Sequence, residues 1–271
     1  MVTFISSPVF RRTVRLEPVP NVPAMVMSGK ARWVCVSDLH LGIEVQLRRS
    51  GFNIPSQSTR MLDDLVALAK SGDRLLVLGD VKHRIPSVSY HEDREIPPFF
   101  AKLKDVYDEI VVVAGNHDGG LGALLGEGVK VFAGPGTVVE DVGATHGHVW
   151  PSKEAMEAKR LIMGHIHPSV LLVDTIGSAT NEKCWVRAKL RKKQILDKYE
   201  RCPEELVVVP AFNPLLTGTP INYGERAMLG PLFRNDLVDK RTINAYLLDG
   251  TNVGFPTKKP RSRKYGRLQE D

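Results

Sequence analysis

The stretch EIVVVAGNHD, residues 109–118, joins a short run of β-branched residues to a polar ending. Such a run, bounded by glycine, predicts a buried strand. Two similar stretches precede it, RWVCVSD at 32–38 and RLLVLGD at 74–80. Between them lie helical patterns at 56–70 and at 97–106, the second opening on two prolines, which a helix tolerates at its start. Strands alternating with helices predict a parallel sheet with crossover helices.

After residue 128 the pattern changes to a series of short strands. We expect strands at VKVF, GTVVE, ATHGH, RLIMGHIH and VLLVD, and further ones at 184–188, 206–210 and 244–249. The proline-rich segment PVPNVPAMVM, residues 18–27, is expected at a sheet edge, because proline has no N–H for a second neighbour. The fold class is therefore α/β, a sandwich of two mixed β-sheets flanked by helices. We expect one domain over 1–252, and a basic tail over 253–271, where apolar periodicity is lost.

The composition indicates a protein with a mild preference for polyanions. The net charge is +6, and the basic residues gather in two segments, KCWVRAKLRKKQILDKYER at 183–201 and TKKPRSRKYGRLQED at 257–271. Either segment could equally be a solvated surface. The three cysteines are widely spaced, which argues against a disulfide framework and a structural zinc site, and favours the cytoplasm. No apolar run is long enough to cross a membrane, so we expect no membrane partner.

Five polar clusters each follow a predicted strand. They are Asp38 with His40, Asp80 after Gly79, the run Asn116, His117 and Asp118, the pair His146 and His148, and the pair His165 and His167. The carboxyl ends of strands in α/β sheets meet where ligands bind, so the clusters should converge. Residues i and i+2 of a continuing strand point the same way, so both members of each D-x-H or H-x-H pair would reach one cavity. Carboxylate, imidazole and amide oxygen together favour Mn, Fe or Zn.

As a set, these clusters resemble the metallophosphoesterase (calcineurin-like) superfamily. Its motifs D-x-H, G-D-x-x-D, G-N-H-[DE], H and G-H-x-H are matched by SDLHLG, GDVKH, GNHD, THGH and GHIH, over residues 37–167. The resemblance implies a metallophosphoesterase-type four-layer sandwich and a metal-dependent phosphoric ester hydrolase. DLHLGIE, GDVKH, CWVR and PAFNPLL are similar to the SbcD-related, ICC-like phosphoesterases found mainly in archaea, which extends the likeness to about residues 18–250.

The resemblance also implies a role for each cluster. It implies two divalent ions, Mn with Fe, Zn or Ni as alternatives. One ion would be held by Asp38, His40 and His167, and the other by Asn116, His146 and His165. Asp80 would bridge the two ions. A hydroxide bridging the ions would attack the phosphorus. His117 would stabilise the transition state or protonate the leaving group, with Asp118 orienting it.

Several positions stay open at the level of sequence. His83 stands where most members of the superfamily have Asp, a group that orients a ligand, and an imidazole could serve the same purpose. His148 could be structural or catalytic. Arg187 and Lys189, near the basic segment, could bind substrate phosphates. Asn213, in PAFNPLL, could bind phosphate too, but Asn before Pro more often sets a turn.

Three functions are compatible with these motifs. The first is a phosphodiesterase or nuclease acting on DNA or RNA, supported by the SbcD likeness and the basic segments. The second is a phosphoesterase of small nucleotides, such as cyclic nucleotides or nucleotide pyrophosphates. The third is a non-catalytic nucleic-acid-binding protein, which the intact motifs argue against. The residues after GHIH leave no room for the capping domain and long helices of full SbcD-type nucleases, which weakens the nuclease hypothesis. The oligomeric state stays open.

Overall fold

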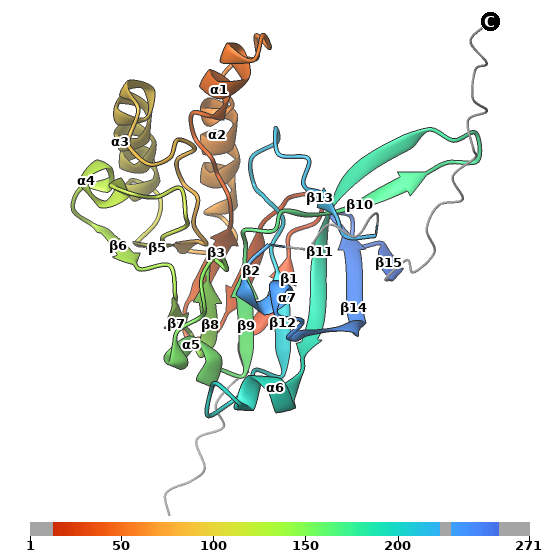
Figure 1. The fold of residues 1–271 in the computed structure, drawn as a ribbon. Coiled ribbons are helices and arrows are strands. Elements are labelled where there is room, and N and C mark those ends of the chain that lie inside the picture. Colours follow the sequence, from red (N-terminus) through yellow and green to blue (C-terminus); the bar gives the residue numbers. More distant parts are fainter. Residues whose placement is uncertain (1–12, 223–228, 255–271) are drawn as a thin grey trace, which may run out of the picture.

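The computed structural model describes residues 13–222 and 229–254 (Figure 1). The first sheet has six strands in the order β1-β2-β3-β4-β5-β6. The strands are β1 (Arg15–Pro18), β2 (Met25–Ser28), β3 (Arg32–Val36), β4 (Arg74–Val77), β5 (Glu109–Val113) and β6 (Val129–Phe132). The four strands β3 to β6 are parallel, whereas β2 pairs antiparallel with β3, and β1 pairs antiparallel with β2.

The second sheet has nine strands. Seven lie in the order β13-β10-β11-β12-β9-β8-β7, and β14 pairs with both β11 and β15. The bounds are β7 (Thr137–Val139), β8 (Val142–Thr145), β9 (Arg160–Met163), β10 (Pro168–Val173), β11 (Ala179–Leu190), β12 (Glu205–Val208), β13 (Thr219–Pro220), β14 (Val238–Leu247) and β15 (Asn252–Gly254). Parallel pairs β8–β9 and β9–β12 form its centre, so both sheets are mixed, as expected. The hairpin of β10 and β11 projects from the body (Figure 1).

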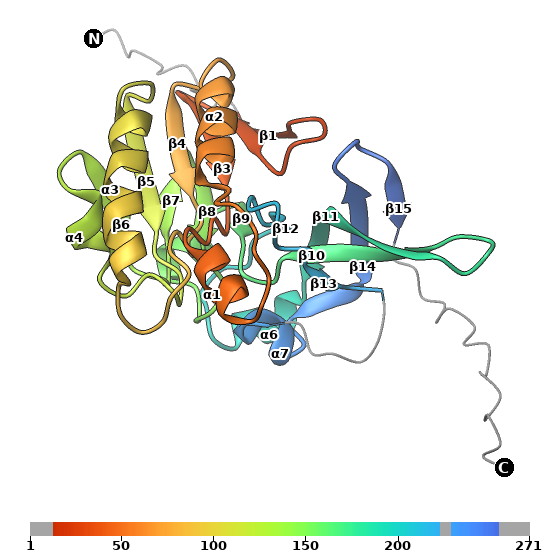
Figure 2. The ribbon, with the colours of Figure 1, turned by 90° about the horizontal axis from the view of Figure 1, so that it is seen from above.

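Seven helices within the described residues flank the two sheets. They are α1 (Ile43–Arg49), α2 (Ser58–Leu68), α3 (Tyr90–Lys104), α4 (Leu121–Leu125), α5 (Lys153–Glu157), α6 (Lys192–Leu196) and α7 (Pro231–Arg234). Figures 1 and 2 show α2 and α3 well apart from α6 and α7.

Three apolar cores separate four layers, because neighbouring residues on a strand face opposite sides. On β3, Val34 packs with α2 and α3, whereas Trp33 and Cys35 face the second sheet. On β9, Ile162 meets the first sheet, and Leu161 and Met163 pack with the helices beyond. The order helix, sheet, sheet, helix confirms the predicted four-layer sandwich.

Two details of the expected fold were wrong. The helix expected at 97–106 begins seven residues earlier, because Ser89 and Glu92 form a capping box that starts α3 at Tyr90. Its prolines, Pro97 and Pro98, therefore lie inside the helix. The edge expected at 18–27 belongs to β1, and the apolar half of that segment is β2, paired on both sides.

The domain boundary predicted at 252 stays a prediction. Strand β15 continues to Gly254, and the rest of the predicted basic tail lies outside the described residues. Among the described helices, none combines the length and apolar character needed to cross a membrane.

Candidate metal centre

The five polar clusters converge at one edge of the sandwich. Three follow the neighbouring parallel strands β3, β4 and β5 of the first sheet, and two follow the parallel strands β8 and β9 of the second. Hydrogen bonds tie the exits together: Asp38 N donates to Gly79 O at 3.1 Å, and Gly164 N donates to His146 O at 3.1 Å. The site therefore lies where the carboxyl ends of the parallel strands of both sheets meet.

The backbone at this edge differs from the continuing strand that the sequence suggested. Asp38, His40, Asp80, His165 and His167 all have positive φ, between 42° and 71°. Left-handed backbone is unfavourable for residues with a Cβ, and such strain gathers at functional sites. Asp38 with His40, and His165 with His167, thus face the same cavity through left-handed turns and not through strand alternation, so that part of the argument was wrong.

Close approach at the edge requires two of the flanking glycines. A Cβ on Gly115 would lie 2.1 Å from Asp80 Oδ1, and one on Gly164 would lie 1.8 Å from Ser37 Oγ. Either side chain would displace the loops that carry the carboxylates. The glycines beside the polar clusters therefore let the loops pack against each other.

The first ligand group brings together Asp38, His40 and His167. One donor atom of each lies within 4.8 Å of the others. Asp38 Oδ1 and His167 Nε2 are 3.1 Å apart. These two atoms and His40 Nε2 are buried and have no hydrogen-bond partner. Buried polar atoms without partners are costly, and three that face one another fit a bound cation.

The second ligand group contains Asp80, His146 and His165, again within 4.8 Å. His146 Nδ1 donates to Leu78 O at 2.7 Å, which turns its Nε2 toward the group. That Nε2 lies 3.2 Å from His165 Nδ1 and 3.3 Å from Asn116 Oδ1. The structure thus brings Asn116 beside these residues, as the sequence suggested.

Asp80 stands between the two groups. Its Oδ2 lies 3.5 Å from His40 Nε2, in the first group, and 3.3 Å from His146 Nε2, in the second. Its Oδ1 accepts from His117 N at 2.9 Å, which fixes the carboxylate. One carboxylate facing two sets of imidazoles is the arrangement that a pair of bridged cations requires.

The protonation states of His40, His165 and Asp80 favour cation binding. Burial lowers the pKa of His40 to about 3 and that of His165 to about 4, so both rings are neutral at pH 7 and keep a lone pair. Burial alone would raise the pKa of Asp80. The hydrogen bond and charge of His146, with the charge of His40, outweigh burial and hold this pKa below its ordinary range. Asp80 is therefore an anion.

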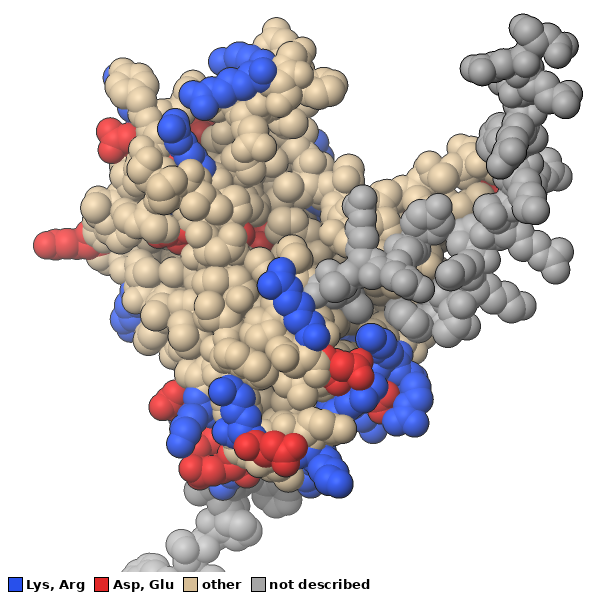
Figure 3. All heavy atoms as spheres, viewed as in Figure 1, with Lys and Arg blue, Asp and Glu red and all other residues tan. Residues whose placement is uncertain are grey.

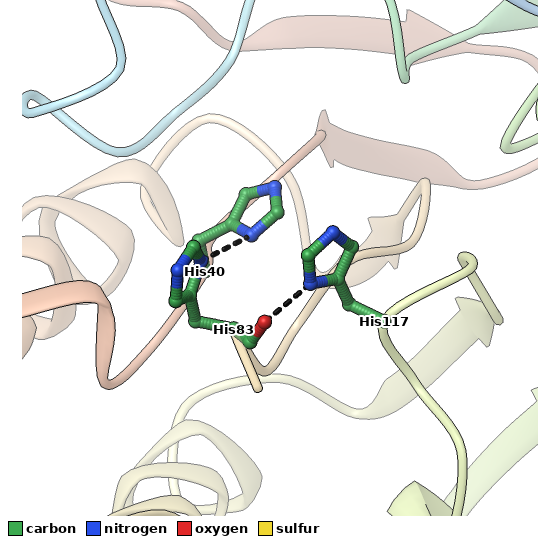
Figure 4. Close-up of side chains that lie close together, drawn as sticks. All are labelled: His40, His83 and His117. Carbon is green, nitrogen blue, oxygen red and sulfur yellow. Dashed lines mark hydrogen bonds between the residues drawn. The ribbon is translucent and has the colours of Figure 1, made fainter. Parts of the chain in front are cut away.

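His83 supports His40 through a chain of hydrogen bonds (Figure 4). His83 Nε2 donates to Gln46 Oε1 at 2.8 Å, which leaves His83 Nδ1 to accept from His40 Nδ1 at 3.1 Å. His40 is then a donor at Nδ1 and has its lone pair at Nε2, the atom that faces Asp80. Gln46, on α1, was missed from the sequence, because a lone Gln on a helix carries no signal of its own.

His117 lies beside the two ligand groups and is fixed by a different residue than expected. Its Nδ1 donates to the backbone carbonyl of His83 (Figure 4), and its Nε2 lies 4.0 Å from Asp80 Oδ2. The expectation that Asp118 orients His117 was wrong. Within the described residues Asp118 accepts only from backbone N–H groups, those of Val81, Lys82 and Gly115. It links the loop after β4 to the loop after β5, and it holds the backbone of the site in place.

Asn213 braces the site and does not face it. The residue is fully buried, its Nδ2 donates to Leu39 O at 2.7 Å, and its Oδ1 accepts from Leu215 N at 2.9 Å. The turn hypothesis is therefore the right one, and the phosphate-binding hypothesis was wrong. Lys183, missed from the sequence within its basic segment, donates to Asn213 O at 2.6 Å and holds the same loop.

Arg187 and Lys189 lie away from the cluster. In the register of β11 with β12 and β9, Arg187 opposes Val207, and Lys189 lies further toward the end of β11 that is remote from the carboxyl end of β9. Arg187 Nε donates to Glu205 Oε1 at 2.6 Å. Figure 3 shows Lys and Arg mixed with acids in this region, around α6. The structure does not bring these two residues to the candidate metal centre, and their phosphate contacts stay a prediction.

His148 lies against the second ligand group without joining it. Its ring centroid is 5.2 Å from that of His146 and 6.0 Å from that of His165. Burial, followed by the charge of His146, lowers the pKa of His148 to about 4. A neutral ring packed against two candidate ligands supports their orientation.

The match to a family model agrees with this geometry. The family model described as calcineurin-like phosphoesterase matches residues 31–238. No curated protein sequence matches the chain. Among solved structures, nuclease MPE from Pseudomonas putida is 18% identical with a TM-score of 0.49, and the match covers 87% of this chain and 98% of that one. YfcE, a phosphoesterase from E. coli, is 16% identical with a TM-score of 0.38, covering 82% and 96%.

The family model spans both sheets and includes each of the five polar clusters. Its range covers well over half of the chain and contains both ligand groups. The chain therefore belongs to the calcineurin-like phosphoesterase family, and it is a metal-dependent phosphoester hydrolase.

Proposed function

We propose that the chain is a phosphodiesterase that works with two divalent ions bound on either side of Asp80. The single observation that carries this proposal is the position of the Asp80 carboxylate, 3.5 Å from one ligand group and 3.3 Å from the other. The proposed ligands are Asp38, His40 and His167 for one ion and Asn116, His146 and His165 for the other, with Asp80 shared. Two such ions would supply the charge that polarises a phosphoryl oxygen and acidifies a water molecule.

His117 is proposed as the general acid. Its Nδ1 is held by the carbonyl of His83, so the ring presents Nε2 to the space beside Asp80. A proton at Nε2 would pass to the leaving oxygen as the ester bond breaks. General acid catalysis contributes about 10²–10⁴-fold to a rate.

Manganese is the proposed ion, with Fe, Zn and Ni as alternatives. The donors are carboxylate and amide oxygens and imidazole nitrogens, and no thiolate belongs to the two ligand groups. This mixture suits Mn better than a closed zinc or iron–sulfur site. The two buried cysteines, Cys35 and Cys184, are free thiols, which supports the narrower proposal of a reducing, cytoplasmic setting. The motifs DLHLGIE and PAFNPLL support a place among the SbcD-related proteins.

The test is hydrolysis of bis(p-nitrophenyl) phosphate by Mn-loaded protein. We expect activity that Asp80→Asn and His117→Ala each reduce by at least about 10²-fold. Calorimetric titration separates the two variants, because Asp80→Asn loses Mn stoichiometry and His117→Ala retains it. His91→Ala, at an exposed histidine of α3, is the matched control and keeps full activity. Loaded protein that hydrolyses no phosphoester would leave the non-catalytic, nucleic-acid-binding alternative.

A further inference from the structure

A groove of about 410 Å³ lies directly beside His117. Its wall is formed by α1, by the loop after β4 and by the residue that caps α3. The lining residues are Gly42, Val45, Gln46, Arg49, His83, Arg84, Ile85, Ser89 and His117. The volume is in the range of ligand-binding pockets, about 300–1,000 Å³. His83 and His117 belong to both the groove and the candidate metal centre, so the two spaces adjoin (Figure 4).

The lining of this groove is cationic. It contains Arg49 and Arg84, both exposed, and no carboxylate. Over residues 13–222 and 229–254, neither guanidinium takes part in an ion pair, in contrast to Arg187, which is paired with Glu205. Two unneutralised guanidinium groups beside a phosphoesterase centre favour a second anionic group on the substrate.

The nearby carboxylate of Glu92 does not line the groove. Glu92 is buried, and its Oε1 accepts from the backbone N–H groups of His83 and Arg84, at 3.0 and 2.7 Å. Its Oε2 accepts from Ser89 N at 2.7 Å and from Ser89 Oγ at 2.8 Å. Glu92 therefore fixes the loop that presents Arg84, and both of its carboxylate oxygens are engaged by groups of the protein itself.

The groove also offers an apolar surface. Ile85 is 51% exposed, and Val45 is half-buried in the opposite part of the wall. Apolar side chains in the same groove as two cations suit a ligand in which a phosphate is attached to a flat or apolar body, as in a nucleotide.

We propose that this groove binds a second phosphate of the substrate, through Arg49 and Arg84, while the scissile phosphate lies at Asp80. The inference rests on the proposed phosphodiesterase function and narrows it. The preferred substrates carry at least two phosphates, and the arm that reaches past His117 carries the second one. Such a phosphate could belong to a nucleic-acid strand or to a nucleotide pyrophosphate, and the substrates chosen for the test separate these sources.

The experiment compares substrates that differ in the number of phosphates. Thymidylyl-thymidine has one phosphate, the corresponding trinucleotide has two along a strand, and a dinucleoside pyrophosphate has two joined directly. Each is assayed with Mn-loaded wild-type protein, with Arg49→Gln, Arg84→Gln and the double variant. Arg48→Gln, at the exposed neighbour on α1 that lies outside the groove, is the matched control.

For a strand substrate, we expect kcat/KM to be higher for the trinucleotide than for the dinucleotide, and each groove variant to reduce that preference about tenfold. The dependence of log(kcat/KM) on log salt should become shallower by about one for each arginine removed. Loss of activity confined to the pyrophosphate would assign the groove to small nucleotides. Arg48→Gln should preserve the preference.

The inference is overturned if the groove variants lower kcat/KM equally on all three substrates, or on none of them. Wild-type protein that fails even on bis(p-nitrophenyl) phosphate would instead remove the proposed phosphodiesterase function. A separate readout keeps the two failures apart. Anisotropy of a fluorescein-labelled phosphorothioate oligothymidylate measures binding without turnover, and unchanged affinity in the double variant, together with unchanged kcat/KM on the pyrophosphate, would overturn the groove by itself.

Discussion

At the scale of single residues, His83 shows how a departure from a motif can preserve its chemistry. The imidazole stands where the resemblance predicts a carboxylate, and it still accepts from His40 Nδ1, because Gln46 fixes the proton of His83 on Nε2. A neutral imidazole also leaves the centre less negative than a carboxylate would, which changes the charge that the bound ions meet.

Replacing His83 tests this support directly. We expect His83→Ala to weaken Mn binding about 10–100-fold, because loss of a group that orients a ligand has this effect in metal sites. Calorimetric titration with Mn²⁺ measures the change, and His91→Ala serves as the exposed control. His83→Asp, which restores an acceptor for His40, should recover part of the affinity. Equal affinity in His83→Ala and in the wild type would show that His40 needs no such partner.

Residue types and their order were enough to predict which side chains meet, but not how the backbone presents them. Asp38, His40 and Asp80 were assigned correctly to one cavity because each follows a buried strand. Their left-handed φ angles carry no sequence signal, since the usual signal is glycine and these are not glycines. The partner of Asp118 was likewise invisible, because backbone N–H groups have no letter in a sequence.

At the scale of elements, the start of α3 links fold stability to the candidate site. Ser89 caps the helix, and Glu92 joins that cap to the loop of His83 and Arg84. The prolines at 97 and 98 pointed to a later start, because proline is favoured in the first turn of a helix. The capping box outweighed them, and the sequence S-x-x-E at 89–92 was the signal that could have corrected the boundary.

Substitutions at this cap should separate its two functions. Ser89→Ala removes one helix cap and should lower the free energy of unfolding by about 1 kcal/mol. Glu92→Leu leaves several buried N–H groups without an acceptor, so we expect a larger loss, about 3 kcal/mol, together with weaker Mn binding as the His83 loop shifts. Urea unfolding and Mn titration measure the two effects. The exposed His91→Ala, on the same helix, is the control. A Glu92 variant as stable as Ser89→Ala would contradict the link.

At the scale of the whole molecule, the sandwich brings the two ligand groups together across its central core. The first group comes from β3 and β9, and the second from β4, β8 and β9, so each group needs both sheets. The change from alternating strands and helices to a run of strands predicted two mixed sheets packed as a sandwich, and the resemblance supplied the four-layer order. The proposed substrate contacts are the part that the sequence indicated least. Charge runs drew attention to Arg187, whereas Arg49 and Arg84, which line the groove, lie outside those runs.

The same burial that prepares the site for cations makes the metal-free protein sensitive to acid. Burial holds the pKa of His40 at about 3, against an ordinary value of about 6.5, and it lowers the pKa values of His83, His148 and His165 as well. Between pH 6.5 and the lowered values, the unfolded chain binds protons that the folded chain excludes. Stability therefore falls as the pH falls through this window.

For His40 alone, which is 3% exposed, the loss between pH 7 and pH 5 is about 2 kcal/mol. His146, whose pKa is raised to about 9 because the hydrogen bond and charge of Asp80 outweigh burial, acts in the opposite sense: its stabilisation is complete below pH 6.5 and is lost as the pH rises toward 9. The raised pKa values of His146 and His167 thus oppose the four lowered pKa values.

We expect the unfolding midpoint of EDTA-treated protein in guanidinium chloride to be clearly lower at pH 5 than at pH 7. His40→Gln removes the largest contribution and should flatten this dependence. A midpoint that stays constant or rises toward pH 5 would mean that the buried imidazoles accept protons without disturbing the fold.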